Sequence, residues 1–127
     1  MDITSKDRRW IAVAKKMLPY SNHPKYRMVA ILVKGGKIVS MGTNSEGPPA
    51  FFIRYAESRG RHAEVRCLFG LDKKYTKGST LYIVGLTVVG NVILSKPCEG
   101  CDGFIRKMGL KRIIYHTVEG LIQGEKL

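Results

Sequence analysis

The apolar residues near the start of the chain recur with the period of an α-helix. Between Ser5 and Leu18 they return every three or four positions, and Pro19 prevents the helix from continuing. The apolar stripe consists of Trp10, Ile11, Val13, Ala14, Met17 and Leu18. We therefore expect an amphipathic helix over 5–18, with Ser5 as its N-cap and one face packed on the rest of the domain.

Two strands joined by a tight turn are expected after this helix. The continuous apolar run at 28–33 is typical of a buried strand, and 37–43 is expected to return beside it. Gly35 and Gly36 between them suit a hairpin turn, because glycine adopts the backbone angles that such turns require. The following stretch, 44–61, is too long for a simple connector, so we expect it to be functional or partly helical.

The second half of the chain alternates between helical and strand patterns. Helices are expected at 62–69 and 98–108, and each is followed by a glycine, which often ends a helix. Strands are expected at 80–84, at 111–115 and, running back antiparallel, at 121–126, with a further strand or hairpin at 87–94. This alternation predicts one α/β domain over 1–127, in which helices cover a mixed sheet.

Size and composition are those of an ordinary soluble globular domain, with 127 residues, 44% of them hydrophobic and 25% charged. No apolar run approaches the roughly 18 residues that a membrane span needs, and no apolar secretory segment opens the chain. The odd count of 3 cysteines argues against a disulfide framework. We therefore expect a cytoplasmic, reducing compartment and no membrane partner.

The charge balance is strongly basic. Lysine and arginine number 22 against 10 acidic residues, which gives a formal net charge of +12. Such a field attracts polyanions, so it favours a substrate that carries phosphate, although a merely solubilising surface is the alternative.

Two short motifs, each at the start of a predicted helix, carry the candidate chemistry. His62 and Glu64 form the first, and Cys98 and Cys101, preceded by Pro97, form the second. A catalytic zinc takes three protein ligands and leaves a fourth position for water, and one imidazole with two thiolates suits it. A carboxylate two residues beyond the histidine is close enough to take a proton from that water and pass it to a departing amine.

A pair of cysteines at this spacing also occurs in structural zinc sites and in redox pairs. A structural zinc would need a fourth ligand, for which His23, His116 and Cys67 are the candidates. A redox pair would leave the His-x-Glu motif without a role. For Cys67 itself, in the middle of a predicted helix, a buried thiol is the expected state.

Together, the two motifs resemble the signature of the zinc-dependent cytidine and deoxycytidylate deaminase superfamily. The predicted order of helices and strands is similar over nearly the whole chain. The resemblance implies a three-layer α/β/α fold with a mixed sheet of about five strands. It also implies that His62, Cys98 and Cys101 hold one Zn²⁺ and that Glu64 moves the protons.

Substrate contacts are expected around these motifs. By the same resemblance, Asn44 holds the sugar or base, and the backbone at Ala63 and Lys96 meets the pyrimidine edge. Asn44 is alternatively a turn residue that closes a strand. Tyr115 and His116 end a strand near the expected pocket, where they are candidates to touch a neighbouring base.

A mixture of aromatic and basic residues in 51–61 favours a polynucleotide. Phe52 and Arg61 are the substrate-binding candidates, since such residues stack on bases and neutralise phosphates. The aromatic residues of this stretch are Phe51, Phe52 and Tyr55, for which core packing is the alternative, and the arginines are Arg54, Arg59 and Arg61. Deamination of cytosine to uracil in single-stranded DNA or RNA is the favoured hypothesis.

Three alternatives stay open. The first is a deaminase of free dCMP, CMP or cytidine. The small size of the chain, which is compatible with a homo-oligomer, favours this alternative. The second is an adenosine deaminase acting on RNA, because the zinc chemistry is common to both bases. The third is a nucleic-acid-binding module with a structural zinc and no turnover, against which Glu64 argues.

Overall fold

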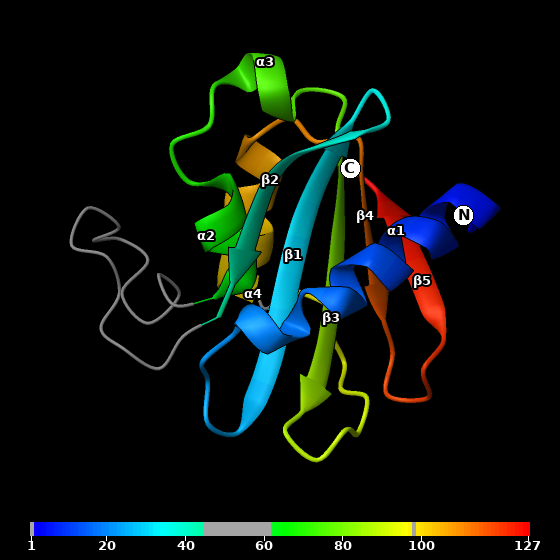
Figure 1. The fold of residues 1–127 in the computed structure, drawn as a ribbon. Coiled ribbons are helices and arrows are strands. Elements are labelled where there is room, and N and C mark those ends of the chain that lie inside the picture. The colour runs from blue at the N-terminus through cyan, green and yellow to red at the C-terminus, as the bar shows by residue number, and fades with distance from the viewer. Residues whose placement is uncertain (1, 45–61, 98) are drawn as a thin grey trace.

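The computed structural model describes residues 2–44, 62–97 and 99–127. Within them the chain forms a three-layer α/β/α domain around a five-stranded mixed sheet of order β2-β1-β3-β4-β5 (Figure 1). The helices are α1 (Ser5–Lys16), the 3₁₀ turn η1 (Leu18–Tyr20), α2 (Ala63–Leu68), α3 (Lys73–Thr76) and α4 (Glu99–Lys107). The strands are β1 (Tyr26–Lys34), β2 (Lys37–Thr43), β3 (Thr80–Thr87), β4 (Arg112–His116) and β5 (Ile122–Lys126).

Strand directions follow the connections between the strands. β1 and β2 form the predicted hairpin, in which Gly35 and Gly36 have φ angles of 60° and 76°. β3 and β4 are parallel, and their connection passes through α4, as a parallel pair requires. β5 returns antiparallel to β4 after a turn at 117–120, as predicted from the pattern.

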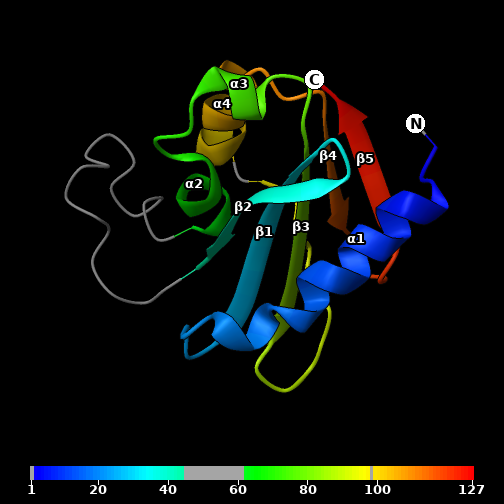
Figure 2. The same ribbon diagram turned by 45° about the horizontal axis from the view of Figure 1, so that its top comes forward.

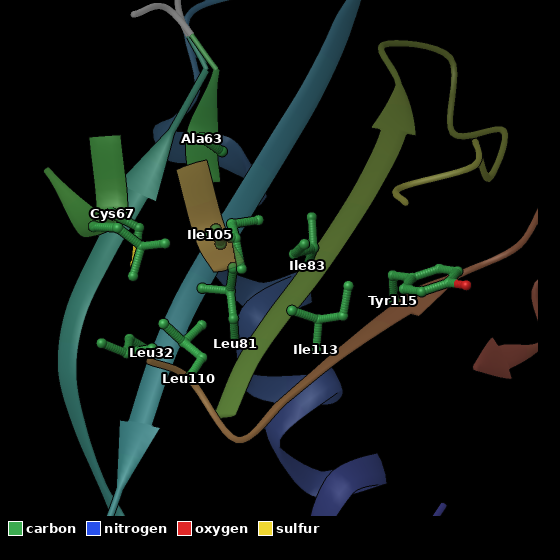
Figure 3. Close-up of a cluster of buried hydrophobic side chains, with 11 residues drawn as sticks. Leu32, Ala63, Cys67, Leu81, Ile83, Ile105, Leu110, Ile113 and Tyr115 are labelled. Carbon is green, nitrogen blue, oxygen red and sulfur yellow. The ribbon is translucent and has the colours of Figure 1, made fainter. Parts of the chain in front are cut away.

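Each face of the sheet has its own hydrophobic core. In β1, Val29 and Ile31 face α1, whereas Ala30 and Leu32 face α2 and α4, because successive strand residues point to opposite sides. Figure 3 shows the second of these cores, and Figure 2 shows α1 crossing the opposite face. The unbroken apolar run of this strand therefore reflects burial on both faces.

α1 is fixed to the sheet through Asp7, which is fully buried. The N-cap is Thr4 rather than the predicted Ser5, and it forms a capping box with Asp7. The Asp7 carboxylate also accepts two hydrogen bonds from Arg112, of 2.7 and 3.0 Å, and one of 2.7 Å from Tyr82. One buried acid thus joins the helix start to β3 and β4.

α2 packs directly against β2 at a glycine. A Cβ atom added to Gly42 would lie 2.3 Å from the carbonyl oxygen of Ala63 and 2.4 Å from the backbone nitrogen of Cys67. The Ser40 hydroxyl adds a hydrogen bond of 2.6 Å to the carbonyl oxygen of Cys67. The absence of a side chain at Gly42 therefore sets how close α2 comes to the sheet.

The sequence predicts a further strand or hairpin at 87–94, and the structure has a minimal hairpin there: one isolated antiparallel bridge, between Leu86 and Val92, with a turn between them. Gly90, at φ 95°, closes this turn. α3 was not predicted; it is a single turn that Asp72 caps. Among the described residues, no helix is long and apolar enough to cross a membrane.

Candidate functional site

Two of the three predicted zinc ligands lie side by side. His62 is the N-cap residue of α2, and Cys101 is buried in the first turn of α4. The Nδ1 atom of His62 is 3.2 Å from the Sγ atom of Cys101. Two such donors on one tetrahedral zinc would be about 3.5 Å apart, given Zn–N near 2.0 Å and Zn–S near 2.3 Å. The imidazole and the thiol therefore fit a shared metal ion.

The third predicted ligand, Cys98, lies outside the described residues. Within 2–44, 62–97 and 99–127, no three His, Cys, Asp or Glu side chains come together as a metal site. The pair of His62 and Cys101 is thus the described part of the candidate centre. Cys101 lies in the first turn of α4, and the thiolate is the form of a cysteine that binds metal.

Glu64 lies in the first turn of α2, two residues after His62, and is only 5% exposed. Burial disfavours the charged carboxylate and raises the pKa of Glu64 to about 7, although a backbone hydrogen bond opposes this shift. A carboxyl group with this pKa can both accept and donate a proton near neutral pH, as general acid–base catalysis requires.

The side chain of Asn44 braces the beginning of β1. Its Oδ1 atom accepts hydrogen bonds of 2.6 Å from the Ser21 hydroxyl and 2.7 Å from the backbone nitrogen of Met28. Its Nδ2 atom donates to the carbonyl oxygen of Tyr26 at 3.1 Å. These bonds agree with the alternative role of a residue that closes a strand. A substrate contact by Asn44 would use the amide nitrogen, and it stays a prediction.

The backbone candidates, Ala63 and Lys96, flank the metal motifs. Ala63 is fully buried between His62 and Glu64. Before Lys96, Ser95 fixes the loop to the sheet: its hydroxyl donates to the carbonyl oxygen of Ile83 at 2.9 Å and accepts from the backbone nitrogen of His116 at 2.8 Å. Nothing in the local sequence marks Ser95, because these bonds join residues far apart in the chain.

The two predicted contacts at the end of β4 lie on opposite faces of the sheet. Tyr115 belongs to the core beneath α2 and α4 (Figure 3). Its hydroxyl donates to Oε1 of Glu125 at 3.3 Å. Burial, and then the nearby charge of Glu125, raise the pKa of Tyr115. Tyr115 is thus on the side of the candidate centre.

His116 follows Ile114 in facing α1, so its side chain points away from His62 and Cys101. It is 1% exposed, and neither ring nitrogen has a hydrogen-bond partner in the described part of the chain. Burial, together with the charge of Lys15, lowers the pKa of His116 to about 4. This placement argues against the predicted substrate contact, because a strand turns alternate side chains to opposite faces.

The remaining candidates, Phe52 and Arg61, lie outside the described residues, as does the aromatic and basic stretch around them. The structure identifies a further residue near the metal motifs, Glu125, which the sequence pattern did not indicate. Its carboxylate is 3.2 Å from Nζ of Lys96, and the hydrogen bond and charge of Glu125 raise the pKa of Lys96. No local pattern in the sequence marks this residue, since its partners come from three other segments.

Several known proteins are similar to this chain. A curated relative, the riboflavin biosynthesis protein RibD of Aquifex aeolicus (strain VF5), is 34% identical over 110 residues. The match covers 86% of this chain and 26% of the relative, so the chain spans about a quarter of its length. A structure of RibD from Acinetobacter baumannii has a TM-score of 0.61 at 20% identity, covering 88% of this chain and 28% of that one.

The dCMP deaminase of cyanophage S-TIM5 is similar over nearly its whole length. Its apo structure has a TM-score of 0.61 at 25% identity and covers 92% of this chain and 86% of that one. Its complex with dCMP and dUMP has a TM-score of 0.65 at 22% identity, with coverage of 94% and 90%. These likenesses confirm the predicted cytidine-deaminase-like fold.

A family model that covers most of the chain shows to which family the protein belongs. The family described as the cytidine and deoxycytidylate deaminase zinc-binding region matches residues 4–117, which include both metal motifs. The chain therefore belongs to the cytidine and deoxycytidylate deaminase family of zinc-binding hydrolases, which act on C–N bonds.

Proposed function

We propose that the chain deaminates a free cytosine nucleotide, with dCMP as the first candidate, to the corresponding uracil nucleotide and ammonia. The observation that carries this proposal is the His62–Cys101 pair, whose Nδ1 and Sγ atoms are 3.2 Å apart, with the buried Glu64 two residues after His62 in the first turn of α2. The likeness to a phage dCMP deaminase, over 94% of this chain and 90% of that one, supports a free nucleotide. The hypothesis of a polynucleotide substrate has no comparable support.

In this proposal His62, Cys98 and Cys101 would hold one Zn²⁺, which would supply Lewis-acid activation of the attacking water near neutral pH. Glu64 moves the two protons of the attacking water, one to N3 of the ring and one to the exocyclic amine, which leaves as ammonia. The bond from C4 to nitrogen breaks as the bond from C4 to oxygen is completed, so that cytosine and water give uracil and ammonia. The predicted backbone contacts at Ala63 and Lys96 orient the ring.

The strong positive charge supports a phosphate-bearing substrate. With a net charge of +12, the protein attracts anions and raises the rate at which they arrive. A nucleoside such as cytidine lacks this attraction. We therefore expect dCMP to be used more efficiently than deoxycytidine.

A second candidate follows from the curated relative. The identity of 34% to RibD supports a deaminase that acts in riboflavin biosynthesis. Only 26% of that protein is covered, so its other activities are no part of this proposal.

The test incubates the zinc-loaded protein separately with dCMP, CMP, cytidine, deoxycytidine and single-stranded DNA and RNA, and measures uracil products by chromatography. We expect dUMP from dCMP, with deoxycytidine used at least about tenfold less efficiently because it lacks the phosphate. Glu64→Gln should retain zinc and lose turnover by a factor of about 10² or more. Product from single-stranded DNA but none from dCMP would contradict the proposal.

A further inference from the structure

The carboxylate of Glu125 reaches two cations at the two ends of one segment. Its Oε1 atom is 3.2 Å from Nζ of Lys96, and its Oε2 atom is 3.7 Å from Nη2 of Arg106. In the sequence, Lys96 lies two residues before Cys98, and Arg106 lies five residues after Cys101. One side chain of β5 thus contacts both flanks of the segment that carries the cysteine motif.

Two further contacts hold Glu125 in place. The hydroxyl of Tyr115, a residue only 4% exposed, donates to Oε1 of Glu125 at 3.3 Å. On the backbone, Glu125 is paired with Ile113 in the antiparallel register of β4 and β5. Because Ile113 belongs to the core under α2 and α4, Glu125 is on the same face of the sheet as the candidate metal centre.

We propose that Glu125 is a positioning residue for the cysteine motif: it fixes both ends of the segment 96–106 against the sheet. The inference rests on the proposed function in one respect, namely that this segment supplies zinc ligands and a substrate contact. Glu125 attracts both cations, and its contact with Arg106 adds to the closer ion pair that Arg106 makes with Asp102 inside α4. Of these two carboxylates, Glu125 is the one that joins the segment to β5.

The expected consequence is local rather than global. The side chains of Lys96, Arg106 and Glu125 are 49%, 50% and 29% exposed, and ion pairs with such exposure contribute little to the stability of a whole domain. They can still restrict a short segment whose ends they join. Loss of Glu125 should therefore loosen 96–106 while leaving the unfolding temperature nearly unchanged.

The chain offers two matched controls. Asp102 binds Arg106 within α4, with Oδ2 2.7 Å from Nε, so Asp102→Asn removes an acid from the same cation without cutting the link to β5. Glu119 is an exposed acid on the turn before β5, so Glu119→Gln removes the same charge from the same hairpin. Neither control should affect the segment as Glu125→Gln does.

The experiment compares backbone hydrogen exchange of the metal-free proteins and the rate at which the zinc-loaded proteins release zinc to a chelator. For Glu125→Gln we expect exchange over 96–106 to rise about threefold to tenfold, with a similar rise in zinc release, since residues that orient ligands commonly change metal affinity tenfold or more. Lys96→Met should act in the same direction, and the double variant should add less than the sum of the two.

Exchange over 96–106 in Glu125→Gln equal to that in Glu119→Gln would overturn the proposal, as would full additivity with Lys96→Met. If Glu125→Gln does not fold, Lys96→Met breaks the same contact from the loop and decides the question. Because exchange is measured without metal or substrate, it gives its answer even if the wild-type protein does not deaminate dCMP. Failure of the wild-type protein to deaminate dCMP would contradict the proposed function but not the positioning role of Glu125.

Discussion

At the scale of single residues, burial decides which polar groups can do chemistry. Glu64 and His116 are both buried, and for both the uncharged form is favoured. Glu64 shares its helical turn with His62, whereas His116 faces α1 on the other side of the sheet. Burial thus gives Glu64 a pKa that suits the proton transfer proposed for it, whereas in His116 it leaves an imidazole without hydrogen-bond partners among the described residues.

His116→Leu should stabilise the protein by about 1–3 kcal/mol at pH 7, because it replaces a buried ring without hydrogen-bond partners among the described residues. The pKa of His116 is lowered to about 4 from an ordinary value of 6.5. As pH falls from 6.5 to 4, the unfolded state takes up a proton that the folded state refuses, so the wild type loses stability in this range. Thermal unfolding at several pH values should show a smaller loss for the variant.

Deamination of dCMP by His116→Leu should match the wild type, since the imidazole points away from the candidate centre. A raised KM with unchanged stability would instead support the contact that the sequence predicted. Steady-state kinetics therefore separate the two roles of this residue.

Of the two described thiols, only that of Cys101 should be needed for zinc binding. Cys101→Ala should lose about one equivalent of zinc, since two protein ligands hold zinc far more weakly than three. Cys67→Ala should keep its zinc, because the Cys67 thiol lies in the core and burial raises its pKa to about 12. Metal analysis by mass spectrometry measures both, and zinc loss from Cys67→Ala alone would contradict the assignment.

At the scale of elements, α1 and α2 each make one specific contact with the sheet in addition to their core packing. α2 approaches β2 at Gly42, and α1 is held by Asp7. The first contact sets the position of His62 and Glu64. The second lies on the far face and stabilises the fold without touching the site.

Gly42→Ala should destabilise the protein by about 1–3 kcal/mol, and displace α2, because the new methyl group would meet backbone atoms at 2.3 and 2.4 Å. Gly103→Ala is the matched control, since a Cβ atom on this exposed residue of α4 has no neighbour within 4 Å. The control should gain up to about 1 kcal/mol of helix stability. Denaturant unfolding and dCMP turnover are measured for both, and equal effects of the two variants would refute the role of Gly42.

Asp7→Asn should lower the free energy of unfolding at pH 7 by about 3 kcal/mol, because it breaks a buried ion pair with Arg112. Burial by itself raises the pKa of Asp7, but hydrogen bonds from Arg112, Thr4 and Tyr82 outweigh it and hold the pKa at about 2. The stability that this carboxylate adds is therefore present above about pH 4 and is lost as pH falls from 4 to 2. Acid unfolding should show this loss in the wild type and not in the variant.

At the scale of the whole molecule, the charge of +12 acts on every anionic ligand, whatever its size. A polynucleotide releases many counterions when it binds, whereas a nucleotide with one phosphate releases few. The dependence of binding on salt therefore distinguishes the proposed substrate from the polymer that the composition favoured.

Raising salt from 50 to 200 mM should increase the KM for dCMP by no more than about fivefold, because the change expected for one phosphate contact is about threefold to fourfold. Binding of single-stranded DNA, measured by fluorescence anisotropy, should weaken much more steeply if it occurs through surface charge alone. Equally steep salt dependence of dCMP turnover would indicate a substrate site built from many surface cations.

Local patterns in the sequence determined much of this protein. The periodicity predicted α1, the β1–β2 hairpin and the antiparallel return of β5, because strand and helix periods depend on the residues within each element. The motifs identified the family, since His62, Glu64 and the two cysteines lie at fixed spacings that zinc chemistry imposes. The net charge and the aromatic and basic residues of 51–61, however, favoured a polymer substrate that the comparisons do not support.

Only the tertiary structure decided which distant residues meet. It brought His62 to 3.2 Å from Cys101, turned His116 to the opposite face and placed Glu125 between Lys96 and Arg106. The physical reason is that these contacts depend on strand order and register, which are set by packing across the whole sheet. A sequence pattern predicts which face of a helix or strand is buried, whereas the tertiary fold determines which residues that face contacts.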